Sequence, residues 1–209
     1  MPSRSSTDVR HRRPSNPAAV SRRTAETTID ISLDLDGSGK FSGQTGVGFL
    51  DHMLAHIAKH GVFDLDVRCE GDLWIDQHHS VEDVGICLGE ALGKAIGDKA
   101  GLVRAGSAFM PLDEALAHAV VDLSGRPYAV LDLKLLGREL GGLPPDLFDH
   151  FLESFAFAAK INLHVRVLYG TNDHHKCEAA FKAVARALDA ATRIDHRRGG
   201  AIPSTKGTL

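Results

Sequence analysis

The chain has 209 residues, of which 43% are hydrophobic and 24% charged, and its formal net charge is −3. These values predict a globular protein with an apolar core, built as one large domain or two small fused ones. The sequence has no apolar run that could cross a bilayer, no apolar stretch typical of a secretory signal and three cysteines without framework spacing, which excludes membrane proteins and disulfide-stapled modules. We therefore expect a cytoplasmic protein with free thiols and no membrane partner.

The beginning of the chain differs in composition from the rest. Residues 1–23 carry six arginines against one aspartate and are rich in serine and proline. A basic tail can contact nucleic acid, but this composition is more typical of a solvated extension. We expect residues 1–20 to form a flexible basic extension, and we expect no nucleic-acid partner.

The remaining chain predicts strands and helices in a repeating order. Apolar and polar residues alternate, as in half-buried strands, over residues 28–35, 65–69, 117–123, 128–133 and 161–165. Apolar residues at helical spacing predict helices over 49–60 and 147–160, and two further helices after Glu82 and Glu178.

This order divides the chain into two halves, residues 21–100 and 101–195, and a tail of residues 196–209. Each half is predicted as strand, strand, helix, strand and helix, with a boundary near residues 98–112. Alternating strands bury one face of a sheet, so helices must cover that face. The sequence therefore predicts an internally duplicated α+β fold of two half-domains, each a small sheet covered by helices.

The clearest sign of the duplication is a motif that occurs twice. Two adjacent histidines are followed by a glutamate one helical turn later, and an Asp-His pair in a similar apolar frame precedes each motif by 26 and 24 residues. The set comprises six imidazoles and two carboxylates: His52, His78, His79, Glu82, His150, His174, His175 and Glu178. One such motif is weak evidence for a metal site, but chance would not place the ligands in register with a repeat.

Helical geometry sorts these candidate ligands. Residues four apart share a face of a helix, so His78 and Glu82 can bind one ion while His79 points elsewhere. The same holds for the second motif, so each motif can supply ligands to two ions. Imidazole and carboxylate ligands favour Mn, Fe, Co, Ni or Zn over Ca or Mg.

The repeat also bears on two other histidines. His56 and His60 follow His52 at helical spacing, which would suit metal ligands. Their counterparts in the second half are Ser154 and Ala158, so the duplication does not preserve them. We predict that neither His56 nor His60 is a ligand.

A stripe of glycines distinguishes one helix from its counterpart. Gly85, Gly89, Gly93 and Gly97 lie four residues apart along the helix after the first motif. Interior glycine destabilises a helix, so the stripe indicates close approach of another backbone. We expect that neighbour to belong to another subunit.

Cationic residues beside turns are candidate phosphate ligands. Arg126 follows a predicted strand, Arg104 lies in the link between the halves, and Lys206 lies near the C-terminus beside Ser204 and Thr205. Guanidinium and ammonium groups suit phosphate, although each position taken alone is more often a solvated charge.

Taken together, the motifs resemble those of the imidazoleglycerol-phosphate dehydratase family. The matching segments follow the family order and cover nearly the whole chain, at residues 23–27, 48–54, 78–85, 124–128, 172–179 and 204–207. No motif position departs from the family pattern, and the arginine-rich start of the chain lies outside it.

The resemblance implies a fold of the ribosomal protein S5 domain 2-like type, two Mn ions per active site, and a homo-oligomeric 24-mer built from trimers with metal sites at subunit interfaces. It implies dehydration of D-erythro-imidazole glycerol phosphate to imidazole acetol phosphate, a step of histidine biosynthesis. The phosphate would be bound by Arg104, Arg126, Ser204, Thr205 and Lys206.

The residues leave the proton-transferring group open. Glu26 would lie near the reacting carbon, as an acid/base or as a ligand of substrate hydroxyls, and Glu82 and Glu178 are competing candidates. Two other functions also remain open, a dinuclear hydrolase and a non-enzymatic protein of metal storage or metal-templated assembly. The histidine-rich ligand set fits a hydrolase less well, and metal storage would give Glu26 and the phosphate ligands no role.

Overall fold

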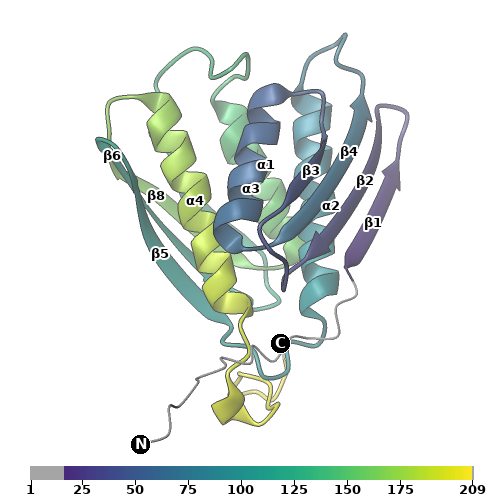
Figure 1. Cartoon of the computed structure of the whole chain (residues 1–209), viewed down its shortest axis with the longest axis vertical. Coiled ribbons are helices and arrows are strands. Elements are labelled where there is room, and N and C mark those ends of the chain that lie inside the picture. The colour runs from purple at the N-terminus through teal and green to yellow at the C-terminus, as the bar shows by residue number, and fades with distance from the viewer. Residues whose placement is uncertain (1–16, 209) are drawn as a thin grey trace, which may run out of the picture.

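The computed structural model describes residues 17–208, and in this part of the chain two four-stranded sheets enclose four α-helices (Figure 1). The first half contains β1 (Ala18–Arg23), β2 (Thr27–Asp34), β3 (Phe41–Gln44), α1 (Gly48–Gly61), β4 (Asp64–Gly71) and α2 (His78–Ile96). The second half contains β5 (Ala105–Leu112), β6 (Ala115–Asp122), β7 (Tyr128–Asp132), α3 (Asp146–Ala159), β8 (Asn162–Tyr169) and α4 (Asp173–Thr192), and a 3-10 helix follows over His196–Arg198. The predicted duplicated α+β fold is confirmed.

Both sheets have the same topology. Their strand orders are β1-β2-β4-β3 and β5-β6-β8-β7, and all neighbours are antiparallel except the parallel pairs β3–β4 and β7–β8. A parallel pair needs a crossover connection, which α1 provides in the first half and α3 in the second.

The core lies between the two sheets. Ile29, Ile31 and Leu33 of β2 are at most 3% exposed, because alternation turns them toward the helices. Helix α1 packs on α4, and α2 packs on α3, so helices of the two halves contact each other between the sheets (Figure 1). The halves therefore share one apolar core, and both of these helix pairs join the first half to the second.

The glycines of α2 approach the other half of the same chain. A Cβ atom on Gly85 would lie 2.9 Å from the carbonyl oxygen of Phe151, and one on Gly89 would lie 2.5 Å from that of Phe155. Both carbonyls belong to α3. At Gly85 and Gly89 the close neighbour that the stripe predicts is therefore a helix of this chain, whereas Cβ atoms on Gly93 and Gly97 would meet no described neighbour within 4 Å.

Some strands differ from the prediction. The sequence does not predict β1 and β5, which are edge strands with a single partner, and it predicts the second strand of the first half, which is β3, only in the order of elements and without bounds. Strand β1 begins at Ala18, inside the range predicted as an extension; residues 1–16 of that extension lie outside the described residues. None of the helices formed by residues 17–208 is long and apolar enough to cross a membrane.

Candidate metal centre

Two clusters of imidazole and carboxylate side chains lie where α2 and α4 begin. We call them the Glu82 cluster (His78, Glu82, His150) and the Glu178 cluster (His52, His174, Glu178). Each cluster joins a helix of one half to a helix of the other, because α3 packs on α2 and α1 packs on α4. The structure thus brings six of the eight predicted ligands into two groups of three.

The Glu82 cluster has an open geometry. The Nε2 atoms of His78 and His150 lie 3.7 and 3.5 Å from Glu82 Oε2, and the three ligand atoms lie within 4.8 Å of one another. Ligand atoms bound to one ion at about 2.1 Å are separated by about 3–4 Å, so only a small contraction is needed. Nε2 of His150 is buried and has no hydrogen-bond partner within the described part of the chain. A metal ion at the centre would satisfy this nitrogen.

The Glu178 cluster is more compact. Oε1 of Glu178 lies 2.8 Å from His52 Nε2 and 2.9 Å from His174 Nε2. Helix α1 supplies His52 and α4 supplies both other residues, at positions four apart on one face of that helix.

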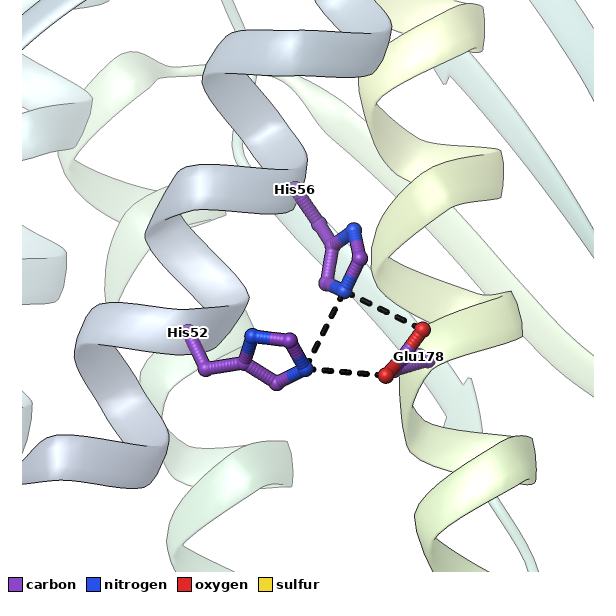
Figure 2. Close-up of side chains that lie close together, drawn as sticks. All are labelled: His52, His56 and Glu178. Atoms are coloured by element: carbon purple, nitrogen blue, oxygen red, sulfur yellow. Dashed lines mark hydrogen bonds and ion pairs between the residues drawn. The ribbon is translucent and has the colours of Figure 1, made fainter.

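His56 also reaches the Glu178 cluster. Figure 2 shows His52 and His56 extending from α1 toward the Glu178 carboxylate, with His56 Nε2 at 3.1 Å from Oε2 and 3.3 Å from His52 Nε2. These three residues form a group that could hold a metal ion, so His56, which the repeat predicts not to be a ligand, lies within reach of the site. A residue present in one half alone can thus face the site. His60 stacks on His56, with ring centroids 5.5 Å apart.

Charge interactions set the protonation states of this cluster. Burial alone would raise the pKa of Glu178, but hydrogen bonds from Lys182, His52 and His174 outweigh it and hold the pKa well below its usual range. Burial lowers the pKa of His56 to about 4, and the nearby Glu178 carboxylate offsets this only in part. At neutral pH the carboxylate is ionised and the His56 ring is neutral, which are the states that metal binding requires.

The second histidine of each motif points away from both clusters. His79 Nδ1 lies 3.0 Å from Oδ2 of the buried Asp72, and His175 Nδ1 lies 2.7 Å from Glu114 Oε2. Hydrogen bonding to these carboxylates raises the pKa of both histidines. A carboxylate on Nδ1 orients the ring and leaves Nε2 to act as a ligand. The prediction that adjacent histidines face different points is confirmed.

Glu114 is a site residue that the sequence analysis misses. It precedes β6 as Glu26 precedes β2, 88 residues earlier, and Glu26 Oε1 lies 3.7 Å from His79 Nε2. Glu114 Oε1 also accepts the backbone N–H groups of Thr171 and Asn172 at 3.0 and 2.7 Å. The 88-residue shift that relates β2 to β6 was the signal that could have identified it.

Arg104 lies far from the Glu178 cluster. Its guanidinium donates to both oxygens of Asp122, at 2.7 and 3.0 Å, and to the carbonyl oxygen of Pro203 at 2.7 Å. Its backbone N–H donates to the carbonyl of Ala191 near the end of α4. Because α4 rises about 1.5 Å per residue, this point is roughly 20 Å along the helix from Glu178.

The other predicted phosphate ligands gather near Arg104. Ser204, Thr205 and Lys206 directly follow the proline that Arg104 binds, and the last two are exposed. Arg126 is exposed on the turn after β6. Leu123, the first residue of that turn, donates its backbone N–H to the carbonyl oxygen of Arg104. One chain therefore holds its phosphate candidates at one end of α4 and the Glu178 cluster at the other.

Comparison with known proteins agrees with this arrangement of motifs. Residues 45–188 match the family model described as imidazoleglycerol-phosphate dehydratase. The imidazoleglycerol-phosphate dehydratases of Roseiflexus sp. (strain RS-1) and Chloroflexus aurantiacus are each 57% identical to this chain over 192 residues, which is 92% of this chain and 96% and 94% of those proteins.

Solved structures give the same result. The imidazoleglycerol-phosphate dehydratase of Staphylococcus aureus matches with a TM-score of 0.78 at 35% identity, covering 86% of this chain and 100% of that one. That of Pyrococcus furiosus, in complex with (S)-C348, matches with a TM-score of 0.78 at 36% identity, covering 91% and 100%. The chain belongs to the imidazoleglycerol-phosphate dehydratase family, whose members are hydro-lyases.

Proposed function

We propose that this protein is a metal-dependent dehydratase that converts D-erythro-imidazole glycerol phosphate into imidazole acetol phosphate and water in histidine biosynthesis. Membership of the family supports the reaction, and the two three-ligand clusters support the dependence on metal. The observation that carries the metal assignment is the buried Nε2 of His150 in the Glu82 cluster, which has no hydrogen-bond partner within residues 17–208. Three free, buried cysteines suit the cytoplasm, where we place the enzyme.

We infer that each cluster is completed by another copy of the chain. Each ion is expected to have three imidazoles and one carboxylate, whereas each cluster holds two imidazoles of that set. His79 and His175 point away from both clusters with Nε2 available. A neighbouring subunit that presents these rings would complete both sites, which supports a homo-oligomer such as the 24-mer of trimers that the resemblance implies.

The distribution of charged residues supports the same arrangement. Arg104 and the Ser204–Lys206 segment cannot reach the Glu178 cluster of their own chain, because α4 separates them. In an assembly, the phosphate candidates of one subunit can face the metal cluster of the next. Arg126, Thr205 and Lys206 are exposed and free to bind a phosphate there, and Arg104 would fix the tail that carries Lys206.

We propose two Mn ions per active site, since imidazole and carboxylate ligands suit Mn and its flexible coordination leaves a position for the substrate. The chemistry that two bound ions supply is stabilisation of negative charge on the substrate's imidazole ring, which favours loss of the hydroxyl group. Glu26 lies beside His79 and would enter a shared site together with it. This position favours Glu26 as the proton-transferring residue, because the oxygens of Glu82 and Glu178 face their own histidines.

An assay on the metal-stripped protein tests this function. Protein freed of metal by a chelator is incubated with imidazole glycerol phosphate, with and without Mn²⁺, and the ketone product is followed by its enol absorbance in alkali. We expect activity that depends on added Mn²⁺. A hydrolase would release inorganic phosphate instead, and a storage protein would take up Mn²⁺ without turning over the substrate; either result would contradict the proposal.

A variant separates the role of Glu26 from metal binding. Glu26→Gln should abolish most of kcat while metal content stays at the wild-type value, because this carboxylate is assigned to the substrate and not to the ions. Metal analysis beside steady-state kinetics measures both quantities. A Glu26→Gln enzyme with wild-type kcat would contradict the assignment.

A further inference from the structure

The two glutamates differ in what holds the oxygen that faces away from the histidines. Glu178 Oε2 pairs with Lys182 Nζ at 2.7 Å, one turn further along α4. Both side chains are 11% exposed, so water screens this pair only weakly. The two oxygens of Glu178 thus have separate partners, His52 and His174 on Oε1 and Lys182 and His56 on Oε2.

The Glu82 cluster has no such cation. The repeat that aligns Glu178 with Glu82 aligns Lys182 with Ile86, an apolar residue. The Glu82 side chain is 38% exposed, and within residues 17–208 its ion-pair partners are the two histidines of its own cluster. Besides His56, whose counterpart is Ser154, a buried ammonium group therefore distinguishes the Glu178 cluster from the Glu82 cluster.

This difference changes the electrostatics of metal binding. An ammonium on one oxygen of a carboxylate repels a divalent cation on the other oxygen, and the repulsion is strong where water is largely excluded. With Lys182 included, the charged groups of the Glu178 cluster sum to zero, whereas the Glu82 cluster keeps one negative charge. Lys182 also holds the Glu178 side chain in one orientation, which favours metal binding. The repulsion is the larger effect, because it acts on the full charge of the ion.

We propose that Lys182 makes the two metal sites unequal, so that the Glu178 cluster binds its divalent cation more weakly and releases it first. Lys182 is a positioning residue that acts through Glu178 and not a ligand of the ion. The inference rests on the proposed function in one respect, that both clusters bind metal. It is independent of the reaction that the ions support.

Stepwise removal of metal from the assembled holoenzyme tests the inference. The Mn-loaded protein is titrated with a chelator, retained Mn per chain is measured by elemental analysis, and released Mn²⁺ by its electron paramagnetic resonance signal. We expect two phases that differ in affinity by about tenfold or more. Glu178→Gln should remove the weaker phase and leave the tighter one, which assigns each phase to its cluster.

The repeat supplies a reciprocal pair of variants. Lys182→Met removes the ammonium while keeping an unbranched side chain, and should tighten the weaker phase by about tenfold. Ile86→Lys places an ammonium group one turn after Glu82, and should lower the Mn²⁺ affinity of the tighter phase toward that of the weaker phase. If the orientation of Glu178 by Lys182 outweighs the repulsion, Lys182→Met will lower the affinity of the weaker phase further, and this result would overturn the inference.

Two other outcomes are also decisive. A single release phase in the wild-type protein, or two phases that neither variant shifts, would overturn the inference and leave the proposed function intact. A protein that takes up no Mn at all would contradict both. Thermal unfolding of each variant shows whether it is folded. A variant that does not fold is replaced by the glutamine variant at the same position. Lys182→Gln should raise the affinity of the weaker phase, and Ile86→Gln should change the affinity of neither phase.

Discussion

At the scale of single residues, each outward-facing histidine is held by a carboxylate from a different part of its half. Asp72 follows β4 and holds His79, whereas Glu114 precedes β6 and holds His175. The candidate ligand histidines could be identified because adjacent pairs repeat in the sequence. Glu114 could not be identified from that motif, since its role depends on strand pairing that brings residues 61 positions apart together.

We predict that Glu114→Gln lowers metal affinity at the site served by His175. A carboxylate on Nδ1 orients the ring and increases its basicity, and losing such a partner typically costs about 10–100-fold in metal affinity. Metal content of the dialysed protein and kcat/KM at limiting Mn²⁺ measure the effect. Asp113→Asn is the matched control, because Asp113 is 75% exposed and lies 3.8 Å from the same ring. Equal effects of the two variants would contradict the role given to Glu114.

At the scale of secondary structure, the spacing of apolar residues was sufficient to predict the bounds of elements that bury a full face. Helices α1 and α3 begin and end within one residue of the predicted ranges, because their apolar stripes face the core. Strand β5 was missed because it is an edge strand built largely of small residues, so that its alternation is weak. The partner of the glycine stripe was also beyond prediction, since it depends on how the two halves pack.

The glycine stripe allows a matched test of that packing. Gly89→Ala should destabilise the protein by about 1–3 kcal/mol, because its Cβ would overlap the backbone of α3. Gly93→Ala should instead stabilise it by about 0.5–1 kcal/mol, since alanine favours the helix and no described atom outside the helix backbone lies within 4 Å of the added Cβ. Urea unfolding of the metal-free protein measures both. Destabilisation by Gly93→Ala would mean that a further surface covers this position.

The turn between β2 and β3 depends on an ionised carboxylate. Oδ1 of Asp64 accepts the backbone N–H groups of Ser38 and Lys40 at 2.7 and 3.0 Å. Burial by itself would raise the pKa of Asp64, but these hydrogen bonds lower it below the ordinary value of 3.8. A depressed folded-state pKa stabilises the fold above the unfolded-state value, and this contribution is lost as pH falls through the folded-state value.

We therefore predict that Asp64→Ala destabilises the protein by about 1–3 kcal/mol at pH 7. The difference from wild type should shrink as the pH is lowered below about 4, where protonation weakens the same contacts in the wild-type protein. Urea unfolding at several pH values checks this. A difference that stays constant between pH 7 and pH 3 would show that the charge of Asp64 contributes nothing.

At the scale of the whole molecule, the duplication explains why two clusters form and why each holds three of the predicted ligands. The sequence predicts two copies of one ligand set, but the grouping of His52 with Glu178 and of His150 with Glu82 follows from the packing of α1 on α4 and α3 on α2. Each of these clusters therefore takes ligands from both halves. The remaining ring of each motif faces outward, and the phosphate candidates lie at the far end of α4, so the account depends on sites that two subunits build together.

Complementation between two inactive variants tests this claim most directly. We propose here that His79 of one subunit completes the Glu178 cluster of another, so His79→Asn and Glu178→Gln each remove one ligand of the same ion, and each protein alone should be inactive. The two metal-free proteins are mixed in equal amounts, reassembled with Mn²⁺ and assayed. If one subunit supplies Glu178 and another supplies His79, about one quarter of these sites regain every ligand, and activity should return to roughly that fraction of the wild-type value. A mixture that stays inactive, although an affinity tag on one variant retains the other and so shows that the two have co-assembled, would contradict the account.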